Sequence, residues 1–302
     1  MPRPDSHTSS FKKTRLILSL SFLFIVLCSA IGLEYIHWKK GNKSFLFYRL
    51  GTPPIQEDIE APDPLILDSL TSLEEPTRVQ PKNKVALLVD DMGYSLKTLR
   101  ELAALNLSLT IAILPYSPWA KETAQMALQN NMEVILHLPL ESLNDFNANA
   151  ATEGLIHSGM SEKDVLEVLE ANLTQVPFIR GVNNHMGSKV TAERETMSLI
   201  LARLKKDNLY FIDSVTSGSS IAFKLAREMS IASAYRHVFL DSETEEGYIL
   251  KQLIQLLRQA QNRGMAVGIC HPYDSTLKVL SENLELFAEY NCEVVFASQI
   301  VE

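Results

Sequence analysis

The chain has 302 residues, of which 46% are hydrophobic and 21% charged, and its formal net charge is −8. This ordinary globular composition excludes an intrinsically disordered chain, a collagen-like repeat and a small disulfide-bonded framework. The charge balance is +6 over residues 1–50, −6 over residues 51–81 and −8 over residues 82–302, and an acidic main segment without a basic stripe is not expected to bind nucleic acid.

An apolar run near the N-terminus predicts a membrane segment. Residues 1–15 form a short basic segment, and the 18 residues from 16 to 33 contain no charge. As a helix this run would be about 27 Å long, close to the hydrocarbon thickness of about 30 Å. We therefore expect a transmembrane signal anchor over residues 16–36. A cleaved signal peptide is the alternative, because small residues at 28–30 permit cleavage.

The anchor predicts a single-pass protein of the inner (cytoplasmic) membrane. Its C-terminal part is expected in the periplasm or outside the cell, and the protein would be secreted if the signal were cleaved. Residues 37–81 show no sustained helical or strand periodicity and contain six prolines interleaved with acidic residues. This composition predicts an extended Pro-rich acidic linker that gives the following domain reach.

Residues 82–302 alternate between short apolar runs and amphipathic stretches. Eight runs are expected to be strands, at residues 85–89, 109–114, 133–138, 178–182, 209–212, 238–240, 265–270 and 293–297. About seven helical stretches lie between them. This alternation predicts one parallel α/β domain.

Capping residues mark the expected starts of several helices. The start signals are Ser95, Pro118, Ser161 (with Asp164 in a capping-box pattern), Thr191 and Ser275. The longest helix is expected over residues 245–262 and ends at Gly264, since glycine readily adopts the left-handed conformation that closes a helix.

Six of the eight expected strands end in side chains that can ionise or bind a metal. These are Asp90 with Asp91, His137, Asn183 and Asn184 with His185, Asp213, Asp241 and His271. In parallel α/β barrels the carboxyl ends of the strands form the active-site rim. No glycine-rich dinucleotide-binding or phosphate-binding motif follows the first strand. The pattern therefore favours a barrel over a doubly wound open sheet.

The adjacent carboxylates of Asp90 and Asp91 are the sharpest local feature. Such a pair repels itself unless a cation or a shared proton relieves it, so metal or acid–base chemistry is favoured over helix capping. His137 and Glu141 have the i,i+4 spacing that brings two ligands together on a helix, although Pro139 disfavours a regular helix there. A core histidine and a solvated surface acid are the alternative for this pair.

The remaining strand-end residues also have structural alternatives. His185 is expected in a binding loop, where the neighbouring asparagines either contribute or only stabilise a turn. His271 is either a general acid or a strand-end hydrogen-bonding residue. Asp213 and Asp241 each precede a serine, and capping of the next helix is an alternative for both and the favoured interpretation for Asp241.

Cys270 and Cys292 are the cysteines of residues 82–302. They form a disulfide in an oxidising compartment if their Cα atoms lie close enough, or they are two buried free thiols. The sequence contains no Cys-x-x-Cys pair and no Gly-x-Ser-x-Gly nucleophile elbow.

Five segments, taken together and in this order, resemble the divergent polysaccharide deacetylases, which are relatives of the NodB-type carbohydrate esterases. The segments are LLVDDMG (87–93), HLPLE (137–141), GVNNHMGS (181–188), FIDS (211–214) and GICHPY (268–273). The resemblance covers essentially all of residues 82–302. It implies a distorted (β/α) barrel of seven or eight strands, preceded here by the one N-terminal transmembrane helix.

The resemblance also implies roles for the strand-end residues. Asp90 corresponds to the catalytic base and His271 to the general acid, while Glu141 stands where a second histidine ligand is usual. The implied metal ligands are Asp91, His137 and His185, with Glu141, Asp213 and Asn184 as additional candidates. The implied cofactor is a divalent metal, with zinc expected because it accepts both nitrogen and carboxylate ligands.

The function that follows from the resemblance is metal-dependent hydrolysis of N- or O-acetylated envelope polysaccharide. A peptidoglycan-type polymer is the expected partner, together with the membrane through the N-terminal helix. The alternative is a non-catalytic glycan-binding or envelope-scaffold protein with a degenerate deacetylase barrel. The sequence indicates neither a protein partner nor an oligomeric state.

Overall fold

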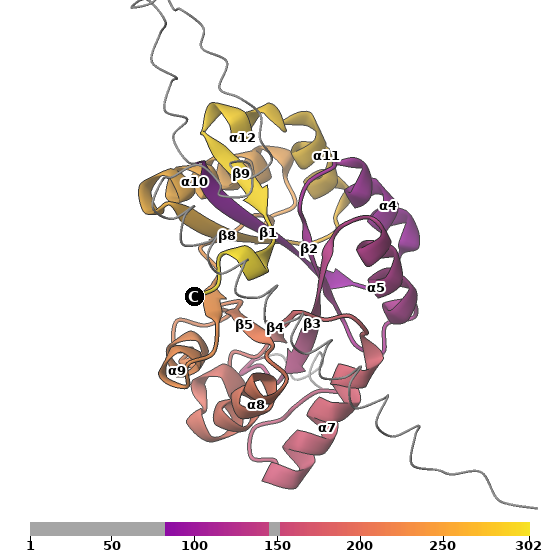
Figure 1. Ribbon diagram of the computed structural model, residues 1–302, viewed down its shortest axis with the longest axis vertical. Helices are drawn as coiled ribbons and strands as arrows, with labels where there is room; N and C mark the ends of the chain where they lie inside the picture. The colour runs from indigo at the N-terminus through magenta and orange to yellow at the C-terminus, as the bar shows by residue number, and fades with distance from the viewer. Residues whose placement is uncertain (1–81, 145–151) are drawn as a thin grey trace, which may run out of the picture. The chain divides into compact units, whose positions relative to one another are not determined.

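The computed structural model describes residues 82–144 and 152–302 (Figure 1). The expected transmembrane segment at residues 16–36 and the linker at residues 37–81 lie outside the described residues. Within the described part of the chain, no helix is both long enough and apolar enough to cross a membrane.

A parallel nine-stranded sheet forms the centre of the described domain. In sheet order the strands run β6-β5-β4-β3-β2-β1-β8-β7, and β9 also pairs with β1. Their bounds are β1 Asn83–Met92, β2 Thr110–Ile113, β3 Glu133–Leu140, β4 Gly181–Met186, β5 Tyr210–Asp213, β6 Ser233–Tyr235, β7 Val238–Phe239, β8 Met265–Cys270 and β9 Cys292–Val295. The expected parallel α/β architecture is confirmed.

The sheet curls like a barrel, and one short segment belongs to both of its outer strands. β6 pairs with β5, and β7, which follows after two residues, pairs with β8 at the other side of the sheet. The backbone N–H of Arg236 donates to Asp213 O, and that of His237 donates to Val267 O. The segment 233–239 is therefore bound to the two sides of the curled sheet in succession.

The helices lie around the outside of the sheet (Figure 1). Their bounds are α4 Leu96–Ala104, α5 Ala120–Gln129, α7 Glu162–Gln175, α8 Arg194–Lys206, α9 Ala222–Glu228, α10 Glu246–Arg263, α11 Asp274–Glu282 and α12 Glu285–Glu289, with 3-10 turns at Val190–Ala192 and Ala297–Gln299. Ser95 and Ser161 cap α4 and α7 as expected, each accepting a backbone N–H three residues later. Gly264 ends α10 with a φ of 81°.

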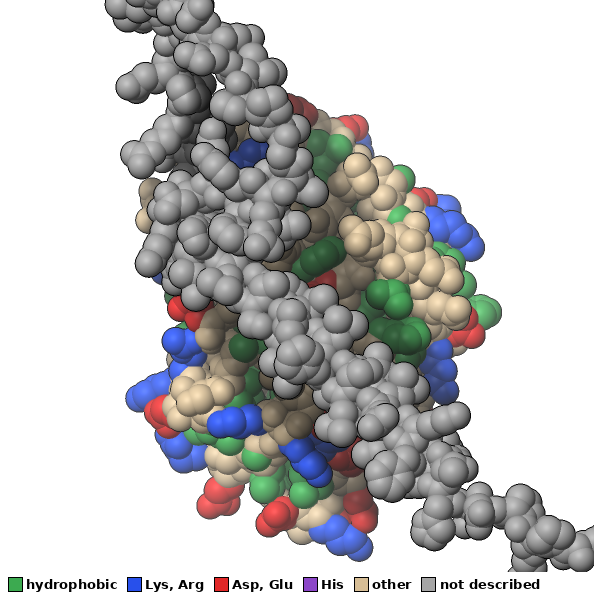
Figure 2. All heavy atoms as spheres, viewed as in Figure 1, with side chains coloured by type: hydrophobic (Ala, Val, Ile, Leu, Met, Phe, Trp, Pro, Cys, Tyr) green, Lys and Arg blue, Asp and Glu red, His purple; other side chains and the backbone are tan. Residues whose placement is uncertain are grey.

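Two apolar layers hold the domain together. On β1, Val85, Leu87 and Val89 belong to the larger cluster between the sheet and the helices, while Ala86 and Leu88 belong to a smaller cluster inside the curled sheet. Both sets are fully buried, as is usual for a parallel sheet covered on both faces. On the face drawn in Figure 2, acidic and basic side chains are interspersed around the margin, and neither forms a stripe.

The fourth expected strand is displaced along the sequence. A strand was expected at residues 178–182, but β4 runs from Gly181 to Met186 and contains both asparagines and His185. Phe178, with a φ of 66°, instead belongs to the turn before it. The segment around His185, expected to be a binding loop, is thus part of a strand. Its polar residues Asn183, Asn184 and His185 belong to the site rather than to the apolar core.

Three further local expectations are corrected. Thr191 does not cap α8: its hydroxyl donates to Gly187 O, and Glu193 precedes the helix. Ser275 lies inside α11 rather than before it, and the stretch expected to be one helix is divided into α11 and α12. The short elements β6 and α9 were not expected, because three and seven residues give too little periodicity to detect.

Cys270 and Cys292 are buried free thiols. Cys270 lies beside Val89 and Cys292 beside Asn83 in the ladders that flank β1. Six residues of strand separate those positions, or about 20 Å, whereas a disulfide needs Cα atoms within about 7 Å. The disulfide alternative is thereby excluded for these two residues.

Substitution of Gly93 is expected to destabilise the domain strongly. Its φ is 117°, and a Cβ atom there would lie 1.8 Å from the Oγ atom of buried Ser117. Gly93→Ala is therefore expected to lower the free energy of unfolding by about 2–4 kcal/mol, measured by urea denaturation. Gly159→Ala is the matched control, because Gly159 also has a positive φ of 78° but open space around it. Equal losses in the two variants would contradict the steric explanation.

Candidate metal centre and adjoining pocket

Side-chain alternation brings three of the site residues to the inside of one end of the barrel. On β1, Ala86 and Leu88 belong to the inner cluster, so the two-residue period of a strand turns Asp90 to the same side. His137 on β3 and His271 after β8 follow inner-cluster residues in the same way. All three lie at the carboxyl ends of their strands, where the sequence predicted the site.

A local irregularity lets the neighbouring aspartates face the same site. Strict alternation would turn Asp91 away from Asp90. The pairing register between β1 and β2 shifts between Val89 and Met92, and Asp91 has a φ of 55°. Such a bulge redirects a side chain, so both carboxylates reach the inside of the barrel end.

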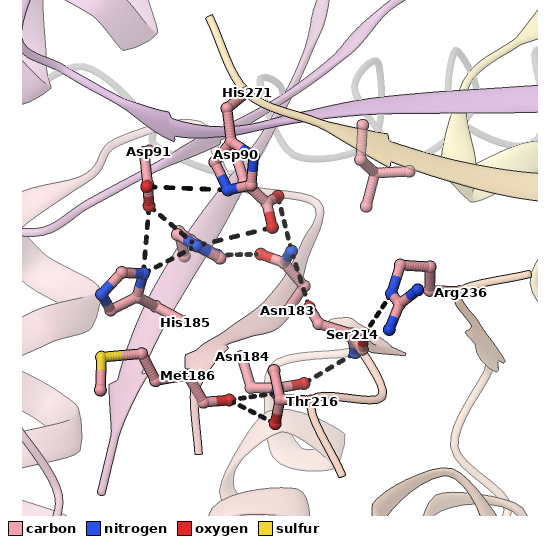
Figure 3. Close-up of polar contacts among 12 residues, drawn as sticks. Asp90, Asp91, Asn183, Asn184, His185, Met186, Ser214, Thr216, Arg236 and His271 are labelled. Carbon is pink, nitrogen blue, oxygen red and sulfur yellow. Dashed lines mark hydrogen bonds and ion pairs between the residues drawn. The ribbon is translucent and has the colours of Figure 1, made fainter. Parts of the chain in front are cut away.

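Asp91, His137 and His185 converge on one point. Figure 3 shows the side chains of Asp91 and His185 directed toward each other. The Asp91 Oδ1 atom lies 3.0 Å from His185 Nδ1 and 3.3 Å from His137 Nε2. The two ring nitrogens are 3.2 Å apart. These three residues come from β1, β3 and β4, which are far apart in sequence. They form the group among the described residues that could hold a metal ion.

The geometry of this triangle fits a tetrahedral cation. Ligand bonds of about 2.0–2.2 Å at tetrahedral angles place neighbouring ligand atoms about 3.3 Å apart. The Asp91 Oδ1 atom is buried, and no described donor gives it a well-directed hydrogen bond. A buried carboxylate oxygen in that condition is costly unless a charge compensates it. Two imidazoles and one carboxylate are also the donor set of known catalytic zinc sites, which leave one position open.

Asn183 connects this group to Asp90. Its Oδ1 atom accepts a hydrogen bond from His137 Nδ1 at 2.8 Å, and its Nδ2 group donates to Asp90 Oδ1 at 2.8 Å. An amide oxygen can only accept, so His137 carries a proton on Nδ1, and Nε2 is the ring nitrogen that binds a cation once its own proton has left. Asn183 is fully buried, and it therefore fixes both the histidine ring and the carboxylate.

His271 is oriented by Asp241. The Asp241 Oδ1 atom lies 3.0 Å from His271 Nδ1, and Oδ2 accepts hydrogen bonds from the backbone N–H of His271 and the hydroxyl of Thr276. This arrangement leaves His271 Nε2 facing the site, 3.8 Å from Asp91 Oδ2. The sequence favoured helix capping for Asp241, and this prediction is wrong. Asp241 instead positions His271.

The carboxylates and imidazoles shift one another's pKa values. Burial raises the pKa of Asp90, although His137 and His271 oppose it. For Asp91 burial acts in the same direction, but His137 and His185 outweigh it and hold the pKa well below its ordinary value. Asp91 is therefore ionised, as a metal ligand must be, while Asp90 binds a proton more readily, as a base must.

For His137 and His271, burial acts to lower the pKa and the neighbouring carboxylates act to raise it. Burial on its own would lower the pKa of His137, but Asp90 and Asp91 outweigh it and raise the pKa to about 9. Burial also opposes the charged form of His271, but its hydrogen bond with Asp241 prevails and raises the pKa. A raised pKa makes His271 keep its proton to higher pH, which suits it to donate that proton to a leaving group, whereas His137 must lose its Nε2 proton to bind a cation.

A pocket of about 380 Å³ adjoins the metal-ligand group. The side chains around it are Asp90, Asp91, His137, Asn184, His185, Met186, Ser214, Val215, Thr216, Arg236, Phe239, Ile269 and His271. Its volume falls in the range of about 300–1,000 Å³ that is usual for small-molecule sites. Val215 has a φ of 49°, which is a strained conformation for a β-branched residue and is common near functional sites.

The additional candidates take other positions. Asn184 lies in the pocket wall, accepting the backbone N–H of Ser214 and donating to Met186 O. Asp213 accepts hydrogen bonds from its own loop and from the start of α9, outside the metal-ligand group. Glu141 pairs with Lys189 Nζ at 2.8 Å and is not part of that group.

The i,i+4 argument for Glu141 fails for a geometric reason. His137 lies on β3, not on a helix. Four residues of strand span about 13 Å, whereas one helical turn brings the same residues within about 6 Å. His185, from the neighbouring strand β4, supplies the nitrogen instead, because Pro139 and His185 are register partners in the β3–β4 ladder.

Sequence comparison gives the family of the matched region. Residues 87–301 match the profile of the family described as divergent polysaccharide deacetylase. An uncharacterized protein of Haemophilus influenzae (strain Rd) is 32% identical over 208 residues, or 69% of this chain and 73% of that protein. The uncharacterized protein YibQ of Escherichia coli K12 is 32% identical over 199 residues, or 66% of this chain and 61% of that protein.

A solved structure has the same fold. An uncharacterized protein from Agrobacterium tumefaciens C58 superposes with a TM-score of 0.68 at 24% sequence identity. The superposition covers 75% of this chain and 92% of that one.

Proposed function

Because this chain belongs to the divergent polysaccharide deacetylase family, we propose that it is a metal-dependent hydrolase that removes acetyl groups from an envelope polysaccharide. The observation that carries the proposal is the triangle of Asp91 Oδ1, His137 Nε2 and His185 Nδ1, with edges of 3.0–3.3 Å. Asp90 and His271 line the same pocket. The site thus combines a ligand set with two residues that can transfer protons.

The residues of the site have distinct tasks in the proposed reaction. A divalent cation, with zinc as the proposed ion, supplies Lewis-acid polarisation of the acyl carbonyl and acidifies water when bound. Asp90 accepts the proton of the attacking water, and Asn183 holds its carboxylate in place. His271 donates a proton to the departing nitrogen or oxygen of the sugar, and Asp241 keeps its Nε2 atom directed at the pocket.

The substrate and location in this proposal rest on the N-terminal sequence. The apolar run at residues 16–33 and the Pro-rich linker that follows would anchor the protein in the inner membrane and let the domain reach material outside it. An N-acetylated polymer of peptidoglycan type is the proposed substrate. Products would be acetate and a free amino sugar.

The test is acetate release combined with metal analysis. We expect the purified full chain to hold about one zinc ion and to release acetate from peptidoglycan and from N-acetylglucosamine oligomers. Chelation is expected to abolish release, and added zinc to restore it. Metal binding without acetate release from any acetylated glycan would contradict the hydrolase proposal and support the glycan-binding alternative.

Zinc affinity is expected to rise with pH. The unprotonated Nε2 atom of His137 is needed for binding, so below a pKa of about 9 the cation competes with a proton. We expect the apparent affinity to increase by up to about tenfold per pH unit from about pH 6.5 to about pH 9 and then to level off. Calorimetric titration measures this slope.

The metal-free protein is expected to show the opposite trend. The pKa of folded His137 lies above the ordinary value of 6.5, so its charged form contributes stability that is complete below pH 6.5 and disappears as the pH rises through about 9. The difference in Tm between zinc-loaded and chelated protein should therefore widen with pH. His157→Gln, which changes an exposed histidine away from the site, is the control. A pH-independent zinc affinity would contradict the prediction.

A further inference from the structure

Exposed aromatic side chains lie on loops at the end of the barrel that holds the metal-ligand group. The large hydrophobic side chains exposed in the described residues include four aromatic ones, Tyr94, Trp119, Phe178 and Tyr273. Tyr94 follows β1, Trp119 follows β2 and Tyr273 follows β8, so three of the four lie at the carboxyl ends of strands. These strands are neighbours in the sheet, in the order β2-β1-β8. We call Tyr94, Trp119 and Tyr273 the aromatic strip.

The loops that carry the strip are connected to one another and to the site. The backbone N–H of Trp119 donates to Gly93 O, next to Tyr94, and Leu114 N donates to Met92 O. Gly93 itself is two residues from Asp91 in the sequence. Tyr94 and Trp119 therefore lie on adjoining loops at the barrel end that holds the metal-ligand group.

Tyr273 joins the strip to the proposed general acid. Its ring stacks on that of His271, with 5.4 Å between the centroids and 28° between the planes. His271 Nε2 lies 3.8 Å from Asp91 Oδ2. None of the three strip side chains lines the pocket itself. Tyr273 therefore contacts a residue of the pocket wall, while Tyr94 and Trp119 lie on the adjoining loops of the same barrel end.

Each ring of the strip is available to a partner. The relative exposures are 63% for Tyr94, 46% for Trp119 and 43% for Tyr273. Tyrosine and tryptophan combine a flat apolar face with a polar edge, and the face matches the C–H face of a pyranose ring while the edge can bond to its hydroxyls.

We propose that the aromatic strip is a binding site for the sugar units of a glycan that lie beyond the unit in the pocket. The inference rests on the proposed function for the class of ligand. A pocket of about 380 Å³ is near the lower end of the usual range for small-molecule sites, so a polymer must cross its edge. Tyr273 contacts His271 in the pocket wall, so bound units outside the pocket would meet the strip, and the protein would select long chains over short ones.

A lipid surface is the less favoured occupant. Interfacial membrane binding uses a broad continuous apolar face, whereas the members of the strip are single exposed side chains on three separate loops. Tyr94 is flanked in the sequence by buried Gly93 and by Ser95, whose side chain caps α4. Single rings spaced along a surface suit successive sugar units better.

The fluorescence of Trp119 can report on the strip directly. The chain contains two tryptophans, Trp38 and Trp119, so Trp38→Phe in the full chain leaves Trp119 as the sole tryptophan. Titration with a hexamer of β-1,4-linked N-acetylglucosamine is expected to shift or quench its emission, and the monosaccharide is expected not to. An unchanged emission at hexamer concentrations that saturate acetate release would overturn the proposal while leaving the hydrolase function standing.

Substitutions then test whether the strip selects for length. Tyr94→Ala and Trp119→Ala are each expected to lower the ratio of kcat/KM for the hexamer to that for the monosaccharide by about tenfold. Phe178→Ala is the matched control, since Phe178 is 55% exposed but precedes β4 at the opposite end of the strand; its ratio should equal that of the wild type.

Binding measured without turnover separates this proposal from the proposed function. A Trp119 response to the hexamer without acetate release would support the strip and contradict the hydrolase. Acetate release with the same length ratio in all variants would overturn the strip alone. Binding of the protein's strip to phosphatidylethanolamine–phosphatidylglycerol vesicles, lost in Trp119→Ala with no hexamer response, would overturn it in favour of a lipid surface.

Discussion

Asp91→Asn is expected to remove the bound cation and with it all metal-dependent activity. The exchange keeps the shape of the side chain but removes the charge that compensates the cation. Changes to outer partners of metal ligands cost about 10- to 100-fold in affinity, so loss of an anionic ligand is expected to cost more than about 100-fold. Elemental analysis should then find less than about 0.1 zinc per chain after dialysis, and acetate release should fall to background.

Asparagine is the informative replacement because of the backbone at this position. Asp91 has a φ of 55°, which asparagine tolerates better than alanine does. Glu141→Gln is the matched control, since it neutralises a neighbouring acid that pairs with Lys189 outside the metal-ligand group. Zinc content equal to that of the wild type in Asp91→Asn would remove Asp91 from the ligand set.

His271→Gln is expected to lower kcat strongly while leaving zinc in place. A positioned general acid contributes about 10²- to 10⁴-fold, and His271 does not belong to the converging ligand group. Acetate release from N-acetylated substrate should fall by that factor. Release from an aryl acetate should fall less, because its leaving group needs no proton. His157→Gln serves as the control, and an unchanged kcat would exclude His271 as the acid.

Asp241 should act through His271 rather than independently. Asp241→Asn removes the charge that holds the imidazole and its proton, so kcat is expected to fall and the pH at which activity is lost on the alkaline side should move lower, toward the ordinary histidine pKa. The double variant with His271→Gln is expected to be no worse than His271→Gln alone, since residues that act as a unit are not additive. Additive losses would show that Asp241 has a separate role.

Much of the fold and part of the site were accessible from the sequence because both have local signals. Buried parallel strands give short apolar runs, and an active-site rim gives polar residues where those runs end. Asp91 and His137 were identified in this way, and the structure brings them together. His185 was expected near the metal but in a loop, since a strand whose side chains line a site lacks the apolar pattern that reveals other strands.

The partners that orient the site were not accessible, since their roles depend on contacts across the sheet. Asn183 lies in a segment whose composition is typical of a turn, yet its side chain forms hydrogen bonds with His137, 46 residues away, and with Asp90, 93 residues away. Asp241 was interpreted as a capping residue because its contact with His271, 30 residues away, leaves no local pattern in the sequence. The sequence does place Asn183 and Asp241 at the carboxyl ends of expected strands, as it does the other site residues. Which of these side chains contact one another depends on the register of neighbouring strands, which the sequence does not show.

The segment 233–239, which pairs with both sides of the curled sheet, links the stability of one side to that of the other. An exposed strand edge is normally where a sheet frays or joins another molecule. Here release of residues 233–239 from β5 would also loosen their hold on β8, because only two residues separate the two ladders. Arg236, which lies in that interval, is also in the wall of the pocket. Release of this segment would therefore displace part of the pocket wall, so an intact site indicates that the two sides of the curled sheet are held together.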